Sequence, residues 1–448
     1  MGLGHKTIMK KILIIVVTSW TLLSNAQTNQ NYTFSLDEAI SYALQHNYYV
    51  LNATNDTKIA EQKRWETTTI GLPQINAGLD YQNNIELQKS LIPAEFFGGN
   101  SGEFLEVAFG TKHNMVARAS ISQLIFDGSY LVGLQAAKTY LEISQNAKIK
   151  TEAEVKTQVI NAYTTVLLAD ESLKIVQKNK ASVQKMLTET QEIYKNGLTE
   201  EENVEQLTIN LAALANAEKN LSRNREIALK FVKYLVGINI DDSLQLSENL
   251  ESILLKNNQL AINSFTVTEN IDYKIAKNVQ RSKELLLKLE KSKALPSLGA
   301  ALNVGYNGFS DTFTFLEKDQ RWLNYSSVGV SLNVPIFSSL GRTARTKQAK
   351  IALEEAKIWL NETEQRLQLD YQKAKSDYDF SLENLDTQKQ NLALAERIEN
   401  KNQLKFKEGI ATSFELTQAQ TQLYTAQQNY LQVIVDVITK KVLLEKML

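Results

Sequence analysis

Apolar residues recur every three or four positions along much of the chain, a pattern typical of helices that wind around one another. From Val155 to Tyr194 the step alternates between four and three residues, and Lys180 and Thr190 are the polar positions of this row. No Pro or Gly interrupts residues 134–196. The pattern predicts a helix over 129–196 that is roughly 100 Å long at 1.5 Å per residue.

A sharp turn and a second helix of the same kind are expected next. Gly197 tolerates positive φ and is predicted to end the first helix. Thr199 is predicted to cap the next helix, over 200–237, whose apolar row has Glu218 as a polar member. The acidic residues 200–202 suit the positively polarised start of that helix. In a second interpretation, they form an acidic surface that faces a partner or a passage.

Between the helices, the period of the pattern changes from about 3.5 to 2, which indicates strands with one apolar face. Four such stretches occur, at 74–82, 114–122, 297–306 and 327–336. They predict two hairpins with long loops, at 84–112 and 307–324. The apolar content of loop 84–112 predicts that it folds inward or packs on its neighbours. A soluble sheet packed on helices is the alternative, but Gly, Ser and Asn on the second face suit a water-filled interior better.

The second half of the chain repeats the first. Leu72-Pro73 recurs 223 residues later as Leu295-Pro296, and Gly197 recurs 212 residues later as Gly409. Each repeat is predicted to hold a helix, a strand hairpin and a long helical hairpin. The predicted helices cover 36–71, 129–196, 200–237, 268–294, 340–407 and 412–448. The domains are then a signal peptide at 1–26, a first repeat at 27–237, a connecting segment at 238–267 with a short helix at 250–255, and a second repeat at 268–448.

Residues 1–26 have the features of a secretory signal peptide, namely a basic start, an apolar core from Ile12 to Leu23 and small residues up to Ala26. An uncleaved membrane anchor, or a start at Met9 instead of Met1, remains an alternative. Beyond this segment no apolar run reaches the roughly 18 residues of a membrane-spanning helix. Entry into a membrane would therefore require a closed β-barrel.

Composition removes several classes of function. The 448 residues carry a net charge of −1, which gives no electrostatic reason to expect nucleic acid as a partner. The chain has no Cys, and neither His46 nor His113 has a second ligand at metal spacing. No phosphate-binding loop occurs. We expect no enzymatic activity, no cofactor and no metal site.

The four predicted strands are too few to close a barrel, which takes about eight. An open sheet in lipid would leave two edges without hydrogen bonds. Several chains are therefore expected to pool their strands, and both a dimer with 8 strands and a trimer with 12 remain open. Strands lead directly into helices near 126–129 and 337–341, so a barrel and a ring of helices would be continuous.

The chain resembles the TolC-like outer membrane efflux proteins over essentially its whole mature length. The segment from Phe34 to Asn47 is similar to the N-terminal segment of that family, Val334-Pro335-Ile336-Phe337 to its strand-to-helix junction, and Phe406 to Leu423 to its helix tip. The resemblance implies an α+β membrane protein, a homotrimer whose 12-stranded outer membrane β-barrel continues into a long periplasmic α-helical barrel. It also implies outer membrane lipid around the barrel, and a periplasmic adaptor and an inner-membrane pump as partners in a Gram-negative bacterium.

The resemblance further implies two kinds of site residue. In the family the periplasmic entrance is narrow near the helix tips, and acidic rings line it in some members. The matching positions here are Glu415 and Gln418, so a trimer would keep one ring of three carboxylates, which favours cations. The alternative is that Glu415 only stabilises a first helical turn. The residues implied to touch the adaptor are Gly197, Leu198, Thr199, Gly409, Ile410 and Ala411.

We therefore expect a passive exit duct of a tripartite efflux or type I secretion system. The alternatives are a secreted periplasmic adaptor, which would need a single helical hairpin, and a secreted coiled-coil scaffold with soluble strands. The sequence does not distinguish drug, metal or protein as the cargo.

Overall fold

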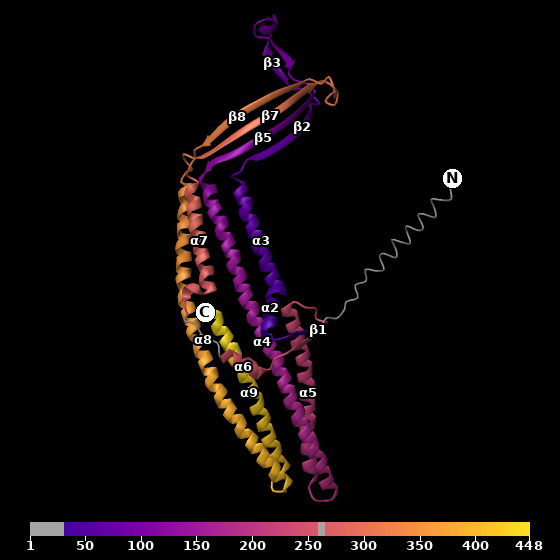
Figure 1. The fold of residues 1–448 in the computed structure, drawn as a ribbon. Helices are drawn as coiled ribbons and strands as arrows, with labels where there is room; N and C mark the ends of the chain where they lie inside the picture. Colours follow the sequence, from indigo (N-terminus) through magenta and orange to yellow (C-terminus); the bar gives the residue numbers. More distant parts are fainter. Residues whose placement is uncertain (1–30, 259–264) are drawn as a thin grey trace, which may run out of the picture. The chain divides into compact units, whose positions relative to one another are not determined.

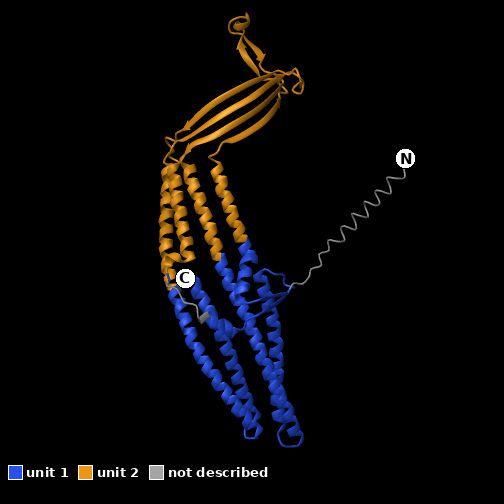
Figure 2. Cartoon of the chain, viewed as in Figure 1, with its two compact units in different colours: residues 1–51, 151–265, 371–448 blue, residues 52–150, 266–370 orange. Residues whose placement is uncertain are grey.

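The computed structural model describes residues 31–258 and 265–448, so the expected signal peptide at 1–26 lies outside the described residues. The chain falls into two compact units (Figure 2). Unit 1 contains residues 1–51, 151–265 and 371–448, and unit 2 contains residues 52–150 and 266–370. Both halves of the sequence therefore contribute to each unit.

Unit 2 contains a four-stranded antiparallel sheet in the order β2, β5, β7, β8 (Figure 1). The strands are β2 (Gln74–Asn83), β5 (His113–Asp127), β7 (Ser297–Ser310) and β8 (Trp322–Asn333). β2 pairs with β5 and β7 pairs with β8, so both predicted hairpins are confirmed. The pairing of β5 with β7, which joins the two hairpins, was not predicted.

The register of this sheet places apolar residues from all four strands on one face. Ile75 lies opposite Ile121, Ile121 lies opposite Leu302, and Leu302 lies opposite Val328. Residues that lie directly opposite each other point to the same face. Ile75 and Val328 are 72% and 78% exposed, so the described chain does not cover this face with helices. The alternative of a half-buried soluble sheet is therefore not observed.

The loop after β2 contains a second, smaller sheet. β3 (Lys89–Pro93) pairs with β4 (Phe104–Ala108), and the short 3-10 helix η2 (Ala94–Phe97) lies between them. Phe96 is 80% exposed and Phe104 is also exposed. The loop is thus an ordered hairpin with exposed apolar side chains within the described chain. That it folds inward or packs on its neighbours stays a prediction.

The observed helices match the predicted helix ranges closely, except for the range 36–71, which is described below. They are α4 (Gly128–Lys195), α5 (Glu201–Val236), α6 (Leu250–Asn258), α7 (Ile271–Ser292), α8 (Gly341–Lys407) and α9 (Ser413–Met447). Each begins and ends within three residues of the expected position. A single turn, η3 (Val267–Glu269), precedes α7.

The two strand-to-helix junctions differ from each other. β5 ends at Asp127 and α4 begins at the next residue, where the Asp127 carboxylate accepts a hydrogen bond from the Tyr130 N–H at 2.8 Å. Between β8 and α8, residues 334–340 form neither strand nor helix. The expected direct passage is therefore wrong at the second junction. Ser339 and Leu340 there have φ angles of 48° and 64°, which no helix or strand accommodates.

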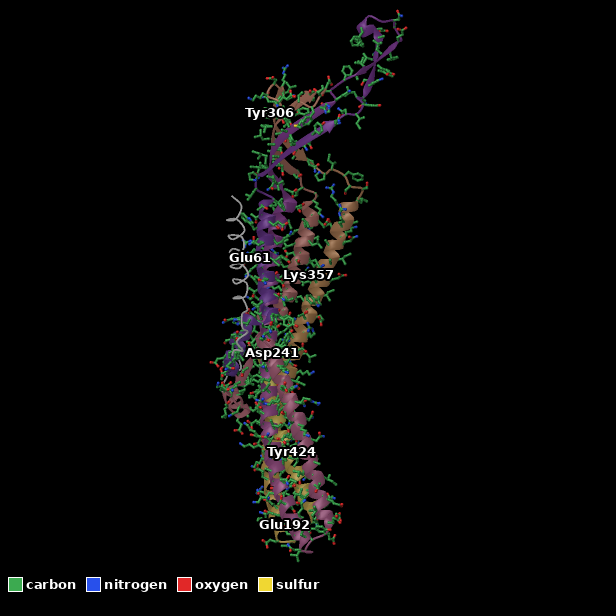
Figure 3. All side chains as sticks on the ribbon, turned by 90° about the vertical axis from the view of Figure 1, so that its right-hand side faces the viewer. Glu61, Glu192, Asp241, Tyr306, Lys357 and Tyr424 are labelled. Carbon is green, nitrogen blue, oxygen red and sulfur yellow. The ribbon has the colours of Figure 1, made fainter. Side chains whose placement is uncertain are left out.

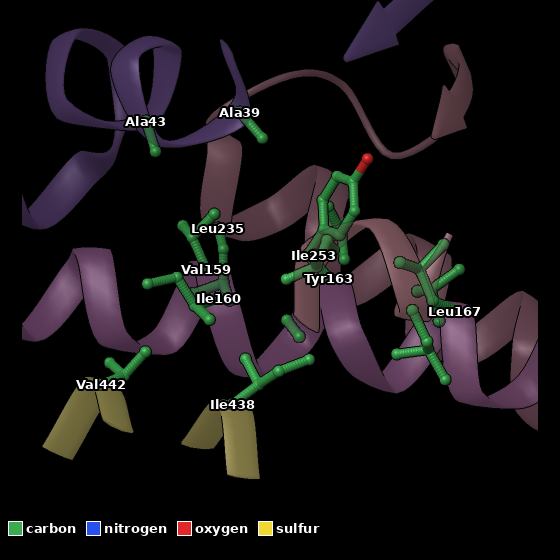
Figure 4. Close-up of a cluster of buried hydrophobic side chains, with 14 of the residues drawn as sticks. Ala39, Ala43, Val159, Ile160, Tyr163, Leu167, Leu235, Ile253, Ile438 and Val442 are labelled. Atoms are coloured by element: carbon green, nitrogen blue, oxygen red, sulfur yellow. The ribbon is translucent and has the colours of Figure 1, made fainter. Parts of the chain in front are cut away.

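Unit 1 has a core around the middle of α4. Tyr163 is fully buried, and its hydroxyl donates a hydrogen bond to the Phe34 carbonyl at 2.9 Å. Burial raises the pKa of Tyr163 to about 12, so it stays a donor. Figure 4 shows this ring among side chains of α2 (Leu36–His46), α4, α5, α6 and α9. Phe34 belongs to β1 (Asn31–Phe34), which pairs in parallel with β6 (Ser243–Leu246); neither strand was predicted.

The helix expected at 36–71 is in fact two helices, α2 and α3 (Tyr48–Thr69). Asn47 separates them with an extended backbone, at ψ 134°. Its side chain is buried, and its Oδ1 accepts a hydrogen bond from the Tyr49 N–H while its Nδ2 donates to the Leu235 carbonyl at 2.7 Å. The predicted single helix is wrong, because this tertiary hydrogen bond to α5 turns Asn47 into a cap.

The predicted apolar rows face other parts of unit 1. Every member of the row on α5 is buried or half-buried, from Val204 to Leu235, and the same holds for the matching row on α9, from Leu416 to Met447. In the row on α4, Tyr194 is exposed and every other member is buried or half-buried. The heptad prediction is confirmed.

We expect Asn47→Ala to lower the free energy of unfolding by about 2 kcal/mol, because a buried carbonyl and a backbone N–H both lose their partner. Denaturant unfolding followed by circular dichroism measures the change. Gln45→Ala is the matched control, since it removes an exposed amide from the same segment. Equal midpoints for the two variants would contradict the assigned role.

Candidate functional site

Both long helical hairpins of unit 1 turn through the same hydrogen-bonded structure. Gly197 and Gly409 each have a φ of 69°, which a residue without a Cβ adopts at little cost. In each turn the glycine N–H binds the carbonyl three residues earlier, and the next N–H binds the carbonyl five residues earlier. These bonds are Gly197 to Tyr194 and Leu198 to Ile193 in the first turn, and Gly409 to Phe406 and Ile410 to Lys405 in the second. Gly197 is thus confirmed as the helix stop.

The second turn is followed by a complete helix cap. The Thr412 hydroxyl accepts a hydrogen bond from the Glu415 N–H at 3.2 Å, and the Glu415 carboxylate accepts one from the Thr412 N–H at 2.9 Å. This reciprocal pair is a capping box. The alternative role of Glu415, stabilisation of a first helical turn, is therefore realised in the structure.

The first turn lacks such a cap. α5 is preceded by Glu200 at the N-cap position, with no side-chain hydrogen bond, so the prediction of Thr199 as the cap is wrong. The Thr199 hydroxyl instead accepts a hydrogen bond from the Asn203 amide at 2.9 Å. Glu201 and Glu202 do lie in the first turn of α5, where acidic residues are favoured.

Glu415 and Gln418 are both exposed on α9. They are three residues apart, so they lie on the same side of the helix. The structure brings Glu415 to Thr412 and leaves the Gln418 side chain at the surface. A carboxylate that holds a cap with one oxygen still presents its charge to solvent, so the cap and a cation-attracting role are compatible.

Asn203 joins the two tips, which the sequence did not reveal. Its Oδ1 accepts a hydrogen bond from the Ser413 N–H at 3.3 Å, while its Nδ2 donates to Thr199. Deeper in the same unit, Asn210 donates to the Gln420 side chain at 3.2 Å. The sequence offered one indication of this role, namely that Asn203 occupies the place in the first repeat that Glu415 occupies in the second.

The residues expected to touch an adaptor include two exposed apolar side chains at equivalent places. Leu198 and Ile410 directly follow the turn glycines and are 78% and 74% exposed. Phe414 is also exposed beside the second turn. Beneath the turns, a small apolar cluster packs together; it consists of Val183, Met186, Leu187, Leu207 and Leu416.

Polar members of the apolar rows are paired above this cluster. Lys180 on α4 donates to Glu218 on α5 at 2.8 Å, and this hydrogen bond is the main cause that lowers the pKa of Glu218. Arg225 on α5 donates to Asp170 on α4. Lys180 and Glu218, polar members of two different rows, therefore meet each other, and Arg225 pairs with an acidic residue beside the row on α4.

Unit 1 also contains a cavity of about 210 Å³ between α4, α5, α8 and α9. Its lining residues include Glu399 and Tyr424, and Figure 3 labels Tyr424. Burial raises the pKa of both groups, and Lys178 opposes the effect at Glu399. Glu399 occupies the position in α8 that corresponds to Leu187 in the apolar row of α4. A carboxyl group therefore interrupts the apolar row of the second repeat there.

The described residues contain no group of three or more acidic or histidine side chains placed to hold a metal ion. His46 stacks on Tyr42, and His113 is hydrogen-bonded to the Tyr81 hydroxyl at 2.8 Å. In residues 31–258 and 265–448, no helix has the length and apolar character needed to cross a membrane.

Comparison with known proteins identifies the family. The family model for outer membrane efflux proteins matches residues 39–237 and 277–448. The chain is 24% identical to the outer membrane protein TolC of Vibrio cholerae over 77% of this chain and 74% of that protein. It is also 24% identical to the alkaline protease secretion protein AprF of Pseudomonas aeruginosa, over 54% of this chain and half of that protein.

Solved structures agree with this fold. The outer membrane protein VceC of Vibrio cholerae has a TM-score of 0.70 at 14% identity, covering 91% of this chain and 94% of VceC. The CmeC outer membrane channel of Campylobacter jejuni has a TM-score of 0.71 at 16% identity, covering 92% of this chain and 85% of CmeC. The family model spans most of the sequence, and the chain belongs to the outer membrane efflux protein family.

Proposed function

We propose that the chain is the passive exit duct of a tripartite efflux or type I secretion system. The observation that carries this proposal is the sheet of unit 2, which exposes one continuous apolar face and has two unpaired edges within the described chain. Such a sheet is stable in lipid only when its edges are closed. Membership of the outer membrane efflux family favours this function over a periplasmic adaptor or a soluble scaffold.

Three copies would close the sheet as a 12-stranded barrel, with β8 of one copy beside β2 of the next. The long helices would continue it as a periplasmic helical barrel. Duplication of one ancestral unit accounts for the matched helices, since α4 and α8 have 68 and 67 residues and α5 and α9 have 36 and 35. The corresponding domains are a signal peptide at 1–26, repeats at 27–237 and 268–448, and a connecting segment at 238–267.

The duct has no energy source of its own in this proposal. A periplasmic adaptor would dock on the turns at Gly197–Thr199 and Gly409–Ala411, and an inner-membrane pump would supply the energy. Asn203 and the capping box of Thr412 hold the two turns in place within one chain. Opening of the entrance would then require these contacts at the tips to move apart.

We expect the purified protein to form discrete conducting channels in planar lipid bilayers, with higher conductance in Asn203→Ala, because the link between the tips is lost. Single-channel recording at fixed salt provides the measurement. Thr208→Ala is a control, since its hydroxyl binds only within its own helix. An absence of conductance in all three proteins would refute the exit-duct proposal.

We propose that Glu415, together with Gln418, lines the entrance, and two substitutions separate charge from capping. Glu415→Gln removes the charge but keeps a side chain that completes a capping box. It should lower cation preference with little change in stability. Glu415→Ala should lower both, with a stability loss of about 1 kcal/mol.

Reversal potentials in a salt gradient measure the preference, and thermal unfolding measures the stability. If the reversal potential of Glu415→Gln equals that of the wild type, Glu415 is a cap and not part of the entrance.

We expect Leu198→Ser with Ile410→Ser to weaken adaptor binding by roughly tenfold or more, because exposed apolar side chains at a contact contribute most of its energy. Binding to the periplasmic adaptor of the same organism is measured with the purified proteins. Ile358→Ser with Leu369→Ser, which removes two exposed apolar side chains of α8, serves as the control. Unchanged binding by the tip variant would exclude these residues from the contact.

A further inference from the structure

A hollow of about 590 Å³ lies in unit 2 where β8 gives way to α8. One part of its lining is apolar, from Ile336, Phe337 and Leu340. Another part is mainly basic, from Lys291 on α7 and Lys347 on α8. The carboxylate in this lining, Glu290, forms ion pairs with Lys293 and Arg345. An apolar wall beside a basic wall is the complement of an anionic amphiphile.

The apolar wall is held in an exposed position by the backbone. Ile336, Phe337 and Leu340 are 88%, 80% and 71% exposed. The Arg342 guanidinium donates hydrogen bonds to the Pro335 carbonyl at 2.8 Å and to the Ile336 carbonyl at 3.1 Å, which fixes this segment. Leu340 adopts a left-handed φ of 64°, a conformation that costs energy for a residue with a side chain. The segment is therefore constrained, and it is not the frayed end of a helix.

The basic wall has charges that the described chain does not neutralise. The first ten residues of α8, 341–350, contain four basic side chains and no acidic one. The start of a helix already carries positive partial charge, so cations there are unfavourable unless an anion is near. Arg342 binds carbonyl groups and Arg345 lies 3.5 Å from Glu290. The ammonium groups of Lys291 and Lys347 have neither a hydrogen bond nor an ion pair within residues 31–258 and 265–448.

The equivalent junction of the first half lacks this charge. Residues 128–138, at the start of α4, contain Lys138 as their one charged side chain. The end of α3 lies beside this junction, where the Tyr130 hydroxyl donates to the Thr68 carbonyl, and it balances Lys63 and Arg64 with Glu61 and Glu66. The cluster of basic side chains is thus specific to the β8–α8 junction and does not occur at the β5–α4 junction.

We propose that this hollow binds an anionic phospholipid of the membrane leaflet on the helix side, with an acyl chain against Ile336, Phe337 and Leu340 and the phosphate near Lys291 and Lys347. The proposal rests on the outer membrane placement of the sheet. The hollow lies where β8, with its exposed apolar residues, ends, so the acyl chain would continue the lipid that covers this strand. Basic residues near a membrane surface attract acidic lipid headgroups.

The test compares lipid retention by the full-length protein purified in detergent. Phosphatidylglycerol or phosphatidylcholine with identical acyl chains is added in equal amounts, and native mass spectrometry counts the retained lipids. The wild type should retain phosphatidylglycerol in excess. Lys291→Gln with Lys347→Gln should lower its retention by about tenfold, because the two lysine charges that attract the headgroup are lost. Lys58→Gln with Lys277→Gln, two exposed lysines elsewhere in unit 2, should retain it as the wild type does.

Measurements on the wild type keep the test valid if a variant fails to fold. High salt should reduce retention of phosphatidylglycerol and leave that of phosphatidylcholine unchanged, since it screens charge only. Inorganic phosphate at the same concentration should not displace the lipid, because it lacks an acyl chain. Equal retention of both lipids by the wild type, or displacement by inorganic phosphate, would overturn the proposal. Channel conductance would be unaffected by that result, so the exit-duct proposal is tested separately.

Discussion

Unpaired backbone groups at the two edges of the sheet set the main constraint on this protein. β2 and β8 each offer one row of N–H and C=O groups without a partner in the described chain. Water can solvate such groups, but hydrocarbon cannot, and each unsatisfied group costs several kcal/mol there. The exposed apolar face of the same sheet is unfavourable in water. In the proposed trimer, lipid covers the apolar face and neighbouring copies pair with the edges, so both requirements are met together.

In unit 1, side chains cover the apolar surfaces of the helices and satisfy the backbone groups at the helix ends. Their apolar rows cover one another, and the polar positions in these rows are placed opposite partners, as Lys180 is opposite Glu218. At the turns, the glycines, the capping box and Asn203 satisfy the backbone groups that helix ends leave free. The tips are therefore defined structures held by few contacts, which is compatible with the proposed opening of the entrance.

Most of the secondary structure was predictable because its causes are local. A period near 3.5 placed α4, α5, α8 and α9 and their buried faces, and a period of 2 placed the strands and their apolar face. Two of the errors occurred where a distant residue decides the outcome. Asn47 divides α2 from α3 through a bond to Leu235, and β1 pairs with β6 across more than 200 residues. Neither contact leaves a periodic signal in the sequence.

In the candidate site, too, some features depend on neighbouring residues and others on residues far apart in the chain. The sequence by itself determined the two turns and the place of Glu415 in a first helical turn, since both depend on neighbouring residues only. The capping box that joins Glu415 to Thr412 is also local, but it was not predicted. Only the tertiary structure decided that Asn203 binds Ser413, that Arg342 holds the segment before α8, and that Lys291 and Lys347 line one hollow. These arrangements join residues that are far apart in the chain or depend on an irregular backbone, and their geometry exists only after the elements have packed.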